Sequence, residues 1–130
     1  MKEVYDYLKE AGVFYLATID NDKPRVRPFG AVNIYNDKLH LITGKTKNVS
    51  KQIEKNNNVE ISAMKEGTWI RIETKLVRDE SIEAKENMLE ANPNLRSMYN
   101  SKDSNMEVLY LEDAKATISS FTNEPKIIEF

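Results

Sequence analysis

The chain has 130 residues, the usual size of one domain, so we predict a single domain over residues 1–130 without separate cofactor and substrate domains. Its residues are 40% apolar and 31% charged, a balance that predicts a compact globular protein and excludes a disordered one. The sequence contains no cysteine, which excludes disulfides, thiolate metal sites, iron–sulfur clusters and cysteine nucleophiles. A redox role therefore requires a bound cofactor.

The first ten residues, MKEVYDYLKE, include acidic residues where a signal peptide has its apolar stretch. No apolar run approaches the roughly 20 residues that a helix needs to cross a bilayer. We therefore expect a cytoplasmic protein without a membrane partner.

The net charge of −2 conceals an uneven distribution along the sequence. Residues 23–55 hold eight Lys or Arg residues against two acidic residues, so the rest of the chain is strongly acidic. A basic stretch of this kind is either a solvated surface or a binding site for an anion such as a phosphate. The spacing of the individual residues has to distinguish the two.

The first elements alternate between helical and extended patterns. Apolar residues recur at helical spacing up to Gly12, which predicts an amphipathic helix closed by a glycine. Residues 13–19 and 24–35 read as two strands around an Asp-Asn-Asp turn. The second segment contains two prolines and a glycine, so we expect an edge strand, or a strand bent near Pro28 and Gly30.

The later elements continue this alternation. We predict a strand over 38–43, a helix over 46–55 that begins with a Thr46 cap, and strands over 59–64 and 68–77. The remaining predicted elements are a helix over 81–91, a short helical piece over 94–99, strands over 106–111 and 114–121, and a final apolar run, 126–130, without an assigned role. Short strands at hairpin spacing with few helices favour an antiparallel barrel of the α+β class.

Three residues of the second strand share one face. Alternate side chains of a strand project to the same side, so Arg25, Arg27 and Phe29 lie together, opposite Val26 and Pro28. Guanidinium groups match phosphate oxygens and stack on flat rings. An exposed basic strand that pairs with acidic neighbours explains the same pattern, and for this strand taken alone it is the better interpretation.

A second polar cluster lies at the predicted strand-to-helix connection, where Thr43 and Gly44 are followed by Lys45, Lys47 and Asn48. Free backbone N–H groups and the helix dipole favour an anion at a helix start. Lysines are unfavourable there for the helix itself, which favours a role in binding. The absence of both G-x-G-x-x-G and G-x-x-x-x-G-K-[ST] argues against a Rossmann-type dinucleotide site and P-loop chemistry.

The residues that serve most often in acid–base catalysis are sparse in this sequence. His40 is the single histidine and lies in an apolar strand segment, so we expect it to pack within the strand rather than to bind a metal or act in a catalytic triad. No pair of carboxylates has a spacing typical of acid–base work. The sequence therefore indicates neither a catalytic residue nor a metal site.

Six segments, in this order, resemble the FMN-binding split-barrel family of the pyridoxamine 5′-phosphate oxidases: VFYLATID, PRVRPFG, LHLITGKTKNV, GTWIRIE, MLEANPNLRSMY and VLYLEDAKATISSF. The resemblance covers nearly the whole chain and is strongest to the short members of that family. It implies an α+β fold with an antiparallel six-stranded split β-barrel and short flanking helices. It also implies a homodimer with two FMN sites at the subunit interface.

The resemblance further implies which residues contact FMN, namely those of the basic strand and of the loop after the third strand. The FMN-binding residues that we predict are Arg25, Arg27, Pro28, Thr43, Lys45, Lys47, Asn48 and Trp69, with Arg71 as a further candidate. Trp69 is assigned to the neighbourhood of the isoalloxazine ring, although the single Trp of a small domain also suits a core or dimer-interface position.

The implied function is that of an FMN-dependent oxidoreductase of the flavin reductase type. Hydride passes from a reduced nicotinamide or other reduced substrate to the flavin, and electrons then pass to a small acceptor such as a quinone, a nitro compound or oxygen. The oxidases proper have an arginine-containing substrate segment near their end, and this chain has no arginine after Arg96, so we do not expect pyridoxal phosphate synthesis.

Two alternatives belong to other functional classes. The first is a non-catalytic binding or sensor protein of the same fold that holds flavin, haem or deazaflavin. The second is a protein that binds single-stranded nucleic acid on a basic, aromatic barrel surface. The acidic remainder of the chain argues against the second, so we predict no nucleic-acid partner.

Overall fold

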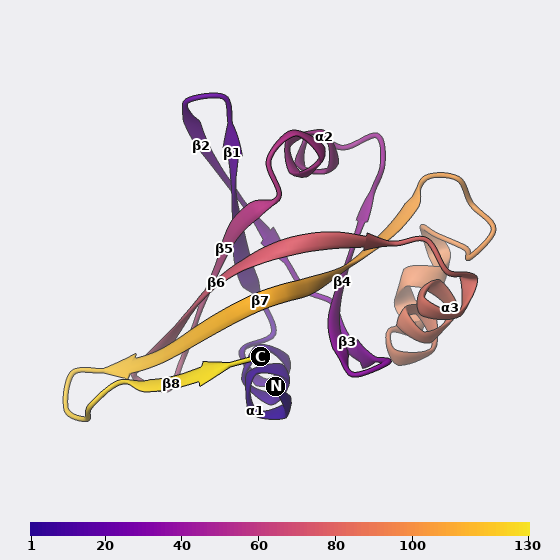
Figure 1. Ribbon diagram of the computed structural model, residues 1–130. Helices are drawn as coiled ribbons and strands as arrows, with labels where there is room; N and C mark the ends of the chain where they lie inside the picture. Colours follow the sequence, from indigo (N-terminus) through magenta and orange to yellow (C-terminus); the bar gives the residue numbers. More distant parts are fainter.

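The computed structural model describes residues 1–130 and shows one eight-stranded antiparallel sheet with helices packed around it (Figure 1). The helices are α1 (Lys2–Ala11), α2 (Asn48–Lys55), α3 (Ile82–Ala91) and the 3₁₀ helix η1 (Pro93–Ser97). The strands are β1 (Phe14–Asp20), β2 (Lys23–Phe29), β3 (Val32–Tyr35), β4 (Lys38–Gly44), β5 (Asn58–Lys65), β6 (Thr68–Asp79), β7 (Met106–Ser120) and β8 (Lys126–Glu129). The predicted α+β class is confirmed.

The sheet is a barrel that remains open on one side. Its strand order is β2-β1-β5-β6-β7-β4-β3, and β8 pairs with β7 outside this path. The end strands β2 and β3 do not pair with each other, so the barrel is split between them. Helix α2 contacts both β1 and β4, and Figure 1 shows it between the β1-β2 pair and the β3-β4 pair. The predicted split-barrel fold is therefore confirmed, with α2 bridging its two halves.

The sheet has eight strands, whereas the resemblance implied six and the sequence pattern predicted seven. Two differences add a strand to that pattern and a third removes one. The predicted strand over 24–35 is divided at Gly30 and Ala31, so that β2 pairs with β1 and β3 pairs with β4. The first half is an edge strand, as its two prolines predicted. The final run, which had no predicted role, forms β8 against β7.

The two strands predicted over 106–111 and 114–121 are one continuous strand, β7. The interruption expected between them is absorbed as an irregularity, because Asp113 has a φ of 52° and the register with β6 shifts between Glu73 and Lys75. Such a bulge bends a strand without ending its pairing. The continuous β6-β7 pair forms the long arm that extends to the lower left in Figure 1.

Helix α1 follows its predicted pattern. Val4, Tyr7 and Leu8 are buried on one face, and Gly12 ends the helix with a φ of 80° that favours glycine. These side chains join a core of 20 buried residues inside the barrel. A second cluster of seven buried residues lies beneath α3 and η1.

Helix α2 begins two residues later than predicted, and the expected Thr46 cap is wrong. Lys47 is the N-cap and makes no side-chain capping bond, while the Thr46 N–H donates to Asn105 Oδ1 at 3.1 Å. Asn105 thus ties the connection between β4 and α2 to the loop before β7. Since no side chain caps α2, the N–H groups of Asn48 and Val49 are left to external partners, while the Ser50 N–H donates to the Lys47 carbonyl oxygen at 3.1 Å.

His40 packs within the sheet, as the sequence predicted. It is almost fully buried in β4, with Nδ1 3.1 Å from the Lys38 carbonyl oxygen and Nε2 2.9 Å from Asp79 Oδ2. Asp79 was not predicted as its partner. None of the helices has both the length and the apolar composition that a bilayer-spanning helix requires.

Candidate cofactor site

Arg27 is a cation held in place by neutral groups. Its Nη1 donates to Thr18 Oγ1 at 2.7 Å and to the Leu16 carbonyl oxygen at 3.3 Å, and its Nη2 donates to Gln52 Oε1 at 2.7 Å. Partial burial and, secondly, the charge of Arg25 lower the pKa of Arg27 below its usual value. A guanidinium nevertheless stays protonated in proteins, and Arg27 has no ion pair. It is therefore oriented while its charge stays available.

Arg25, two residues earlier on the same face, differs from Arg27 in that a carboxylate neutralises it. Its Nε lies 3.1 Å from Asp20 Oδ2 in an exposed ion pair. The β1-β2 register places Arg25 opposite Thr18, Arg27 opposite Leu16 and Phe29 opposite Phe14. The predicted common face is confirmed, but the structure distinguishes a partly neutralised Arg25 from an unpaired Arg27.

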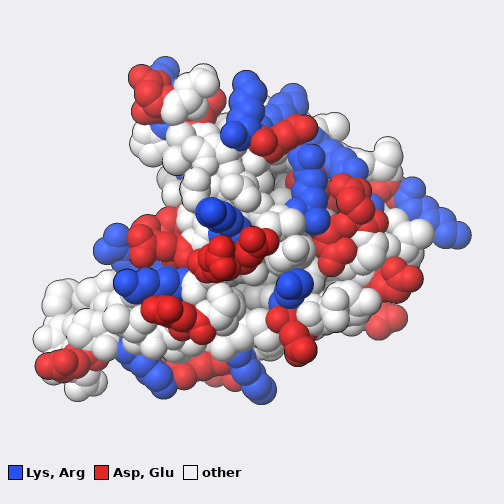
Figure 2. Space-filling view, in the orientation of Figure 1, with Lys and Arg blue, Asp and Glu red and all other residues white.

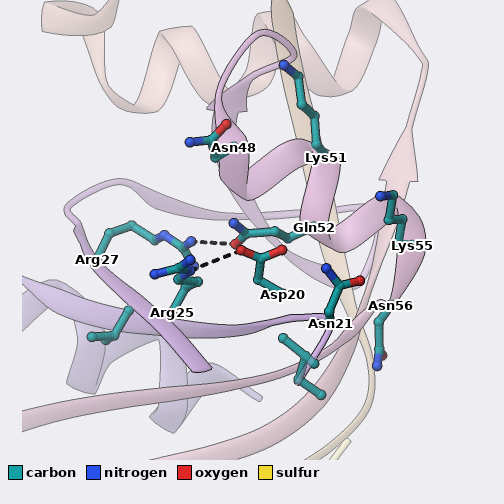
Figure 3. Close-up of a pocket in the computed structure, with 11 residues that line it drawn as sticks. Asp20, Asn21, Arg25, Arg27, Asn48, Lys51, Gln52, Lys55 and Asn56 are labelled. Carbon is teal, nitrogen blue, oxygen red and sulfur yellow. Dashed lines mark hydrogen bonds and ion pairs between the residues drawn. The ribbon is translucent and has the colours of Figure 1, made fainter. Parts of the chain in front are cut away.

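Two clefts open on either side of Arg27, which lines both. The larger, here called the basic cleft, has a volume of about 770 Å³ and lies between the β1-β2 hairpin and α2. It is lined by Ile19, Asp20, Asn21, Arg25, Val26, Arg27, Asn48, Lys51, Gln52, Lys55 and Asn56. Figure 3 shows Arg25 and Arg27 on one side of it and Gln52 of α2 opposite them, while Lys51 extends upward, away from the arginines, and Lys55 lies on the far side.

The smaller cleft, here called the mixed cleft, has a volume of about 370 Å³ and lies between the end of β2, β4 and η1. Half of its 14 lining residues are hydrophobic, against two of 11 in the basic cleft. It is lined by Arg27, Pro28, Phe29, Gly30, Ala31, Ile42, Thr43, Lys47, Val49, Asn92, Asn94, Leu95, Met98 and Tyr99. The volumes of both clefts lie in the range of ordinary ligand sites.

Gly44 allows the loop before β7 to pack closely beside the mixed cleft. A Cβ atom at this position would lie 3.0 Å from Asn105 Nδ2 and 3.3 Å from Tyr99 Oη. The Lys45 N–H also donates to the Asn105 carbonyl oxygen at 2.8 Å. The segment that carries Lys47 is thereby fixed against the segment that carries Tyr99.

A buried ion pair anchors α2 beneath both clefts. Glu107, nearly fully buried in β7, accepts a hydrogen bond from Ser50 Oγ at 2.9 Å, and its Oε2 lies 2.6 Å from Arg78 Nε. Arg78 also lies 3.7 Å from Glu54. Because Ser50 and Glu54 belong to α2, this cluster fixes the helix that presents Gln52 to Arg27.

The structure brings together most of the predicted FMN-binding residues. Arg25 and Asn48 line the basic cleft, Pro28, Thr43 and Lys47 line the mixed cleft, and Arg27 lines both. Lys45 and Trp69 line neither cleft. Lys45 lies 3.7 Å from Glu80, Trp69 packs against Phe121 with a ring-centroid distance of 5.1 Å, and Arg71 lies 3.3 Å from Glu60. The FMN-binding roles of all these residues stay predictions.

Sequence reasoning missed the residues that reach the clefts from elsewhere in the chain. Thr18 and Gln52, which hold Arg27, have no signature in the sequence. Lys51 and Lys55 were counted in the basic stretch, but their four-residue spacing on α2 was not used to place them on one face. The segment with Leu95 and Tyr99 was predicted only as a helical piece.

Comparison with known proteins places the chain in a family. A sequence profile described as pyridoxamine 5′-phosphate oxidase matches residues 1–117. The chain belongs to the pyridoxamine 5′-phosphate oxidase family. Among curated proteins, no significant match is found.

Solved structures of this family's fold resemble the chain over nearly its whole length. The crystal structure of a NimC/NimA family protein from Clostridium acetobutylicum is 44% identical, with a TM-score of 0.97 and coverage of 100% of this chain and 92% of the other. General Stress Protein 26 from Bacillus anthracis is 17% identical, with a TM-score of 0.78 and coverage of 99% and 97%. A heme binding protein from Mycobacterium smegmatis is 13% identical, with a TM-score of 0.72 and coverage of 94% and 57%. The last two share the fold alone.

Proposed function

We propose that the protein is an FMN-dependent oxidoreductase. It accepts hydride from a reduced nicotinamide or another reduced substrate and passes electrons to a small acceptor such as a quinone, a nitro compound or oxygen. This proposal rests on Arg27, whose guanidinium is held by three neutral hydrogen-bond acceptors and lies at the boundary of the two clefts. A guanidinium oriented in advance and not neutralised is suited to bind a phosphate.

The residues around the mixed cleft fit a flavin mononucleotide. Phe29, Leu95 and Met98 give it apolar walls for a flat ring, and Lys47 and Arg27 supply positive charge for the phosphate. The uncapped start of α2, where Lys47 and Asn48 lie, adds backbone N–H groups. When bound, FMN supplies the ring that carries the electrons. The side chains bind it, orient it and exclude water from one face.

A homodimer is the second part of the proposal. Met64 is 74% exposed and Phe121 is 93% exposed, and both are neighbours of Trp69, by strand pairing and ring packing respectively. Exposed apolar groups gathered in this way are typical of an interface. A second copy that packs against this surface in a two-fold arrangement covers it and brings Trp69 towards a cleft that Trp69 does not reach within its own chain.

The alternative is a protein that binds flavin without turnover. One observation favours it: Asp20 is the single carboxylate in either cleft, it is paired with Arg25, and no histidine lines either cleft. The residues present thus offer no free carboxylate or imidazole as a proton donor. Haem is supported less, because His40 is buried and both of its ring nitrogens have partners within the chain.

The test is a titration of the purified protein with FMN, followed by NADH or NADPH under anaerobic conditions. We expect binding, a flavin absorption spectrum that shifts on binding, and bleaching by the reduced nicotinamide. Riboflavin, which lacks the phosphate, is the control and should bind at least about tenfold more weakly, since a hydrogen bond to a charged group contributes about 1.5–3 kcal/mol. Binding without bleaching by any donor supports the carrier, and no binding of FMN contradicts both.

The dimer is tested by sedimentation equilibrium. The expected mass is twice the 15.0 kDa of one chain. A Met64→Asp substitution places a charge on the exposed face and should shift the equilibrium towards the single chain while leaving the fold intact, because the Met64 side chain is largely exposed. A wild-type protein that sediments as a single chain at all concentrations would contradict the dimer.

A further inference from the structure

We propose that the basic cleft is a second anion site, which binds the diphosphate of an adenine dinucleotide. This rests on the proposed function, because Arg27 and Lys47 are there assigned to the single phosphate of FMN. With that phosphate placed, Arg25, Lys51 and Lys55 remain in a cleft twice as large as the mixed cleft. In the proposed binding mode these side chains do not contact the FMN phosphate.

The two lysines of α2 carry the first part of the argument. Lys51 and Lys55 lie four residues apart, both line the basic cleft, and neither forms an ion pair. Like charges at this spacing destabilise a helix by a few tenths of a kcal/mol. The repulsion between the two lysines thus lowers the stability of α2 in the free protein, and a bound anion would offset this loss.

The nearby carboxylates do not neutralise this charge. Asp20 is the one carboxylate that lines the basic cleft, and it faces four cations. It is also engaged by Arg25 at 3.1 Å, while Glu54 of α2 lies 3.7 Å from Arg78 and does not line the cleft. Figure 2 shows the blue atoms of basic side chains gathered at the top of the molecule, over α2. The cleft is therefore an electropositive hollow and not one face of an internal salt-bridge network.

The rest of the lining suits ribose and phosphate groups rather than a second apolar ring. Four side-chain amides reach the cleft, those of Asn21, Asn48, Gln52 and Asn56, and they are labelled around it in Figure 3. Amides donate to phosphate oxygens and both donate to and accept from ribose hydroxyls. The two hydrophobic residues of the lining offer little surface for a ring of isoalloxazine size. The chemistry shared by these groups is that of the ribose and diphosphate of a dinucleotide.

The first experiment measures ADP binding by calorimetry, with and without saturating FMN. The variant is the double substitution Lys51→Ala and Lys55→Ala, and the control is Lys9→Ala on α1, at the lower edge of Figure 1 while α2 lies at the top. We expect the double variant to weaken ADP binding at least about tenfold and to leave FMN binding within about twofold. We expect the control to change neither.

The two sources of the diphosphate are separated by competition. If it belongs to a nicotinamide donor, ADP binds the FMN-loaded protein and the double variant raises the KM for NADH or NADPH with kcat unchanged. If it belongs to a flavin dinucleotide, FAD displaces FMN, binds more tightly than FMN, and prevents ADP from binding. Either result supports the second anion site.

Three results would overturn the inference. They are no ADP binding to the wild type, the same ADP affinity in the double variant, and lysine-dependent binding of a single-stranded oligonucleotide more tightly than of any dinucleotide. Because ADP binding is measured without flavin, it does not depend on the proposed function. If the protein binds FMN and not ADP, the proposed function stands and the second anion site is wrong. If it binds ADP and not FMN, the second anion site stands and the proposed function is wrong.

Discussion

The basic cleft and the mixed cleft share Arg27 but differ in almost every other respect. One is walled by a helix and a hairpin whose side chains are charged or carry amides, and the other by a strand end and η1, which supply apolar side chains. The difference shows that a single fixed cation serves two chemically distinct spaces. A ligand with a flat ring and a phosphate fits across the mixed cleft and Arg27, whereas the basic cleft selects charge and hydroxyl groups.

The largest expected effect comes from removing the shared cation. Arg27→Ala should weaken FMN binding about 10- to 100-fold, because hydrogen bonds from a guanidinium to phosphate contribute about 1.5–3 kcal/mol. Fluorescence titration measures it. Arg25→Ala is the matched control, and its effect should be several-fold smaller since Asp20 already engages Arg25. Equal effects would show that the ion pair does not distinguish the two arginines.

Replacing the amide of Gln52 by a carboxylate tests whether FMN binding requires that the partners of Arg27 are neutral. Gln52→Glu keeps the shape of the side chain whose Oε1 lies 2.7 Å from Arg27 Nη2 but adds a negative charge. We expect about tenfold weaker FMN binding with no loss of thermal stability, because the new ion pair competes with the phosphate. Gln52→Met, which cannot pair with Arg27, is the comparison. Unchanged FMN affinity in Gln52→Glu would remove the observation on which the proposed function rests.

Asp79 links His40 to the start of α3, on the side of the mixed cleft. Burial raises the pKa of Asp79, but hydrogen bonds from His40 and Ser81 outweigh it and hold this pKa below the ordinary value of 3.8. A carboxyl with a lowered folded-state pKa stabilises the fold above its unfolded pKa, and this contribution is lost as the pH falls through the folded pKa. The wild type should therefore lose stability below about pH 4.

Asp79→Asn tests this contribution. It should reduce the free energy of unfolding at neutral pH by about 1–2 kcal/mol, because it weakens the partner of a buried histidine. It should also flatten the dependence of stability on pH below pH 4, as measured by urea unfolding at several pH values. ADP binding in the basic cleft should not change. A variant with the wild-type pH dependence would show that another carboxyl is responsible.

The smallest expected effect concerns the N-cap of α3. Ser81 Oγ accepts a hydrogen bond from the Ala84 N–H at 3.2 Å, so Ser81→Ala should cost about 1 kcal/mol of stability. FMN affinity should fall by less than about threefold, because α3 supports η1 without contacting the phosphate residues. Ser97→Ala, at an exposed site of η1, is the control and should cost less. A larger loss of ADP than of FMN binding would contradict the separation of the two clefts.

Much of the fold was predictable because each element carries its own signal. The glycine after α1, the prolines of the edge strand β2 and the strand-forming residues of β1 and β5 all describe local conformation, and the structure confirms them. The start of α2 was not predictable, because the side chain of Asn105, far along the chain, takes the Thr46 N–H and displaces the cap. The union of two strands into β7 likewise depends on pairing with β6.

The sequence predicted several of the charged residues that line the candidate site, but not which of them form ion pairs. The sequence placed Arg25 and Arg27 on one face, but it gave no means of telling that Asp20 pairs with one and Gln52 with the other. Such differences arise from contacts between residues that are distant in sequence. Trp69 shows the same limit, since it lines neither cleft of its own chain and its predicted position near the flavin requires the proposed dimer.

Helix α2 bridges the open side of the barrel, and this has a consequence for local unfolding. Eight residues form the helix, which packs Val49 and Ile53 into the core and makes polar contacts with Arg27 at one side and Glu107 at the other. Any ligand that engages Arg27, Lys51 or Lys55 binds only the closed helix and so shifts the opening equilibrium towards closure. The amide protons of α2 should then exchange with solvent more slowly in proportion to ligand occupancy, while those of the distant β6-β7 arm keep their own rates.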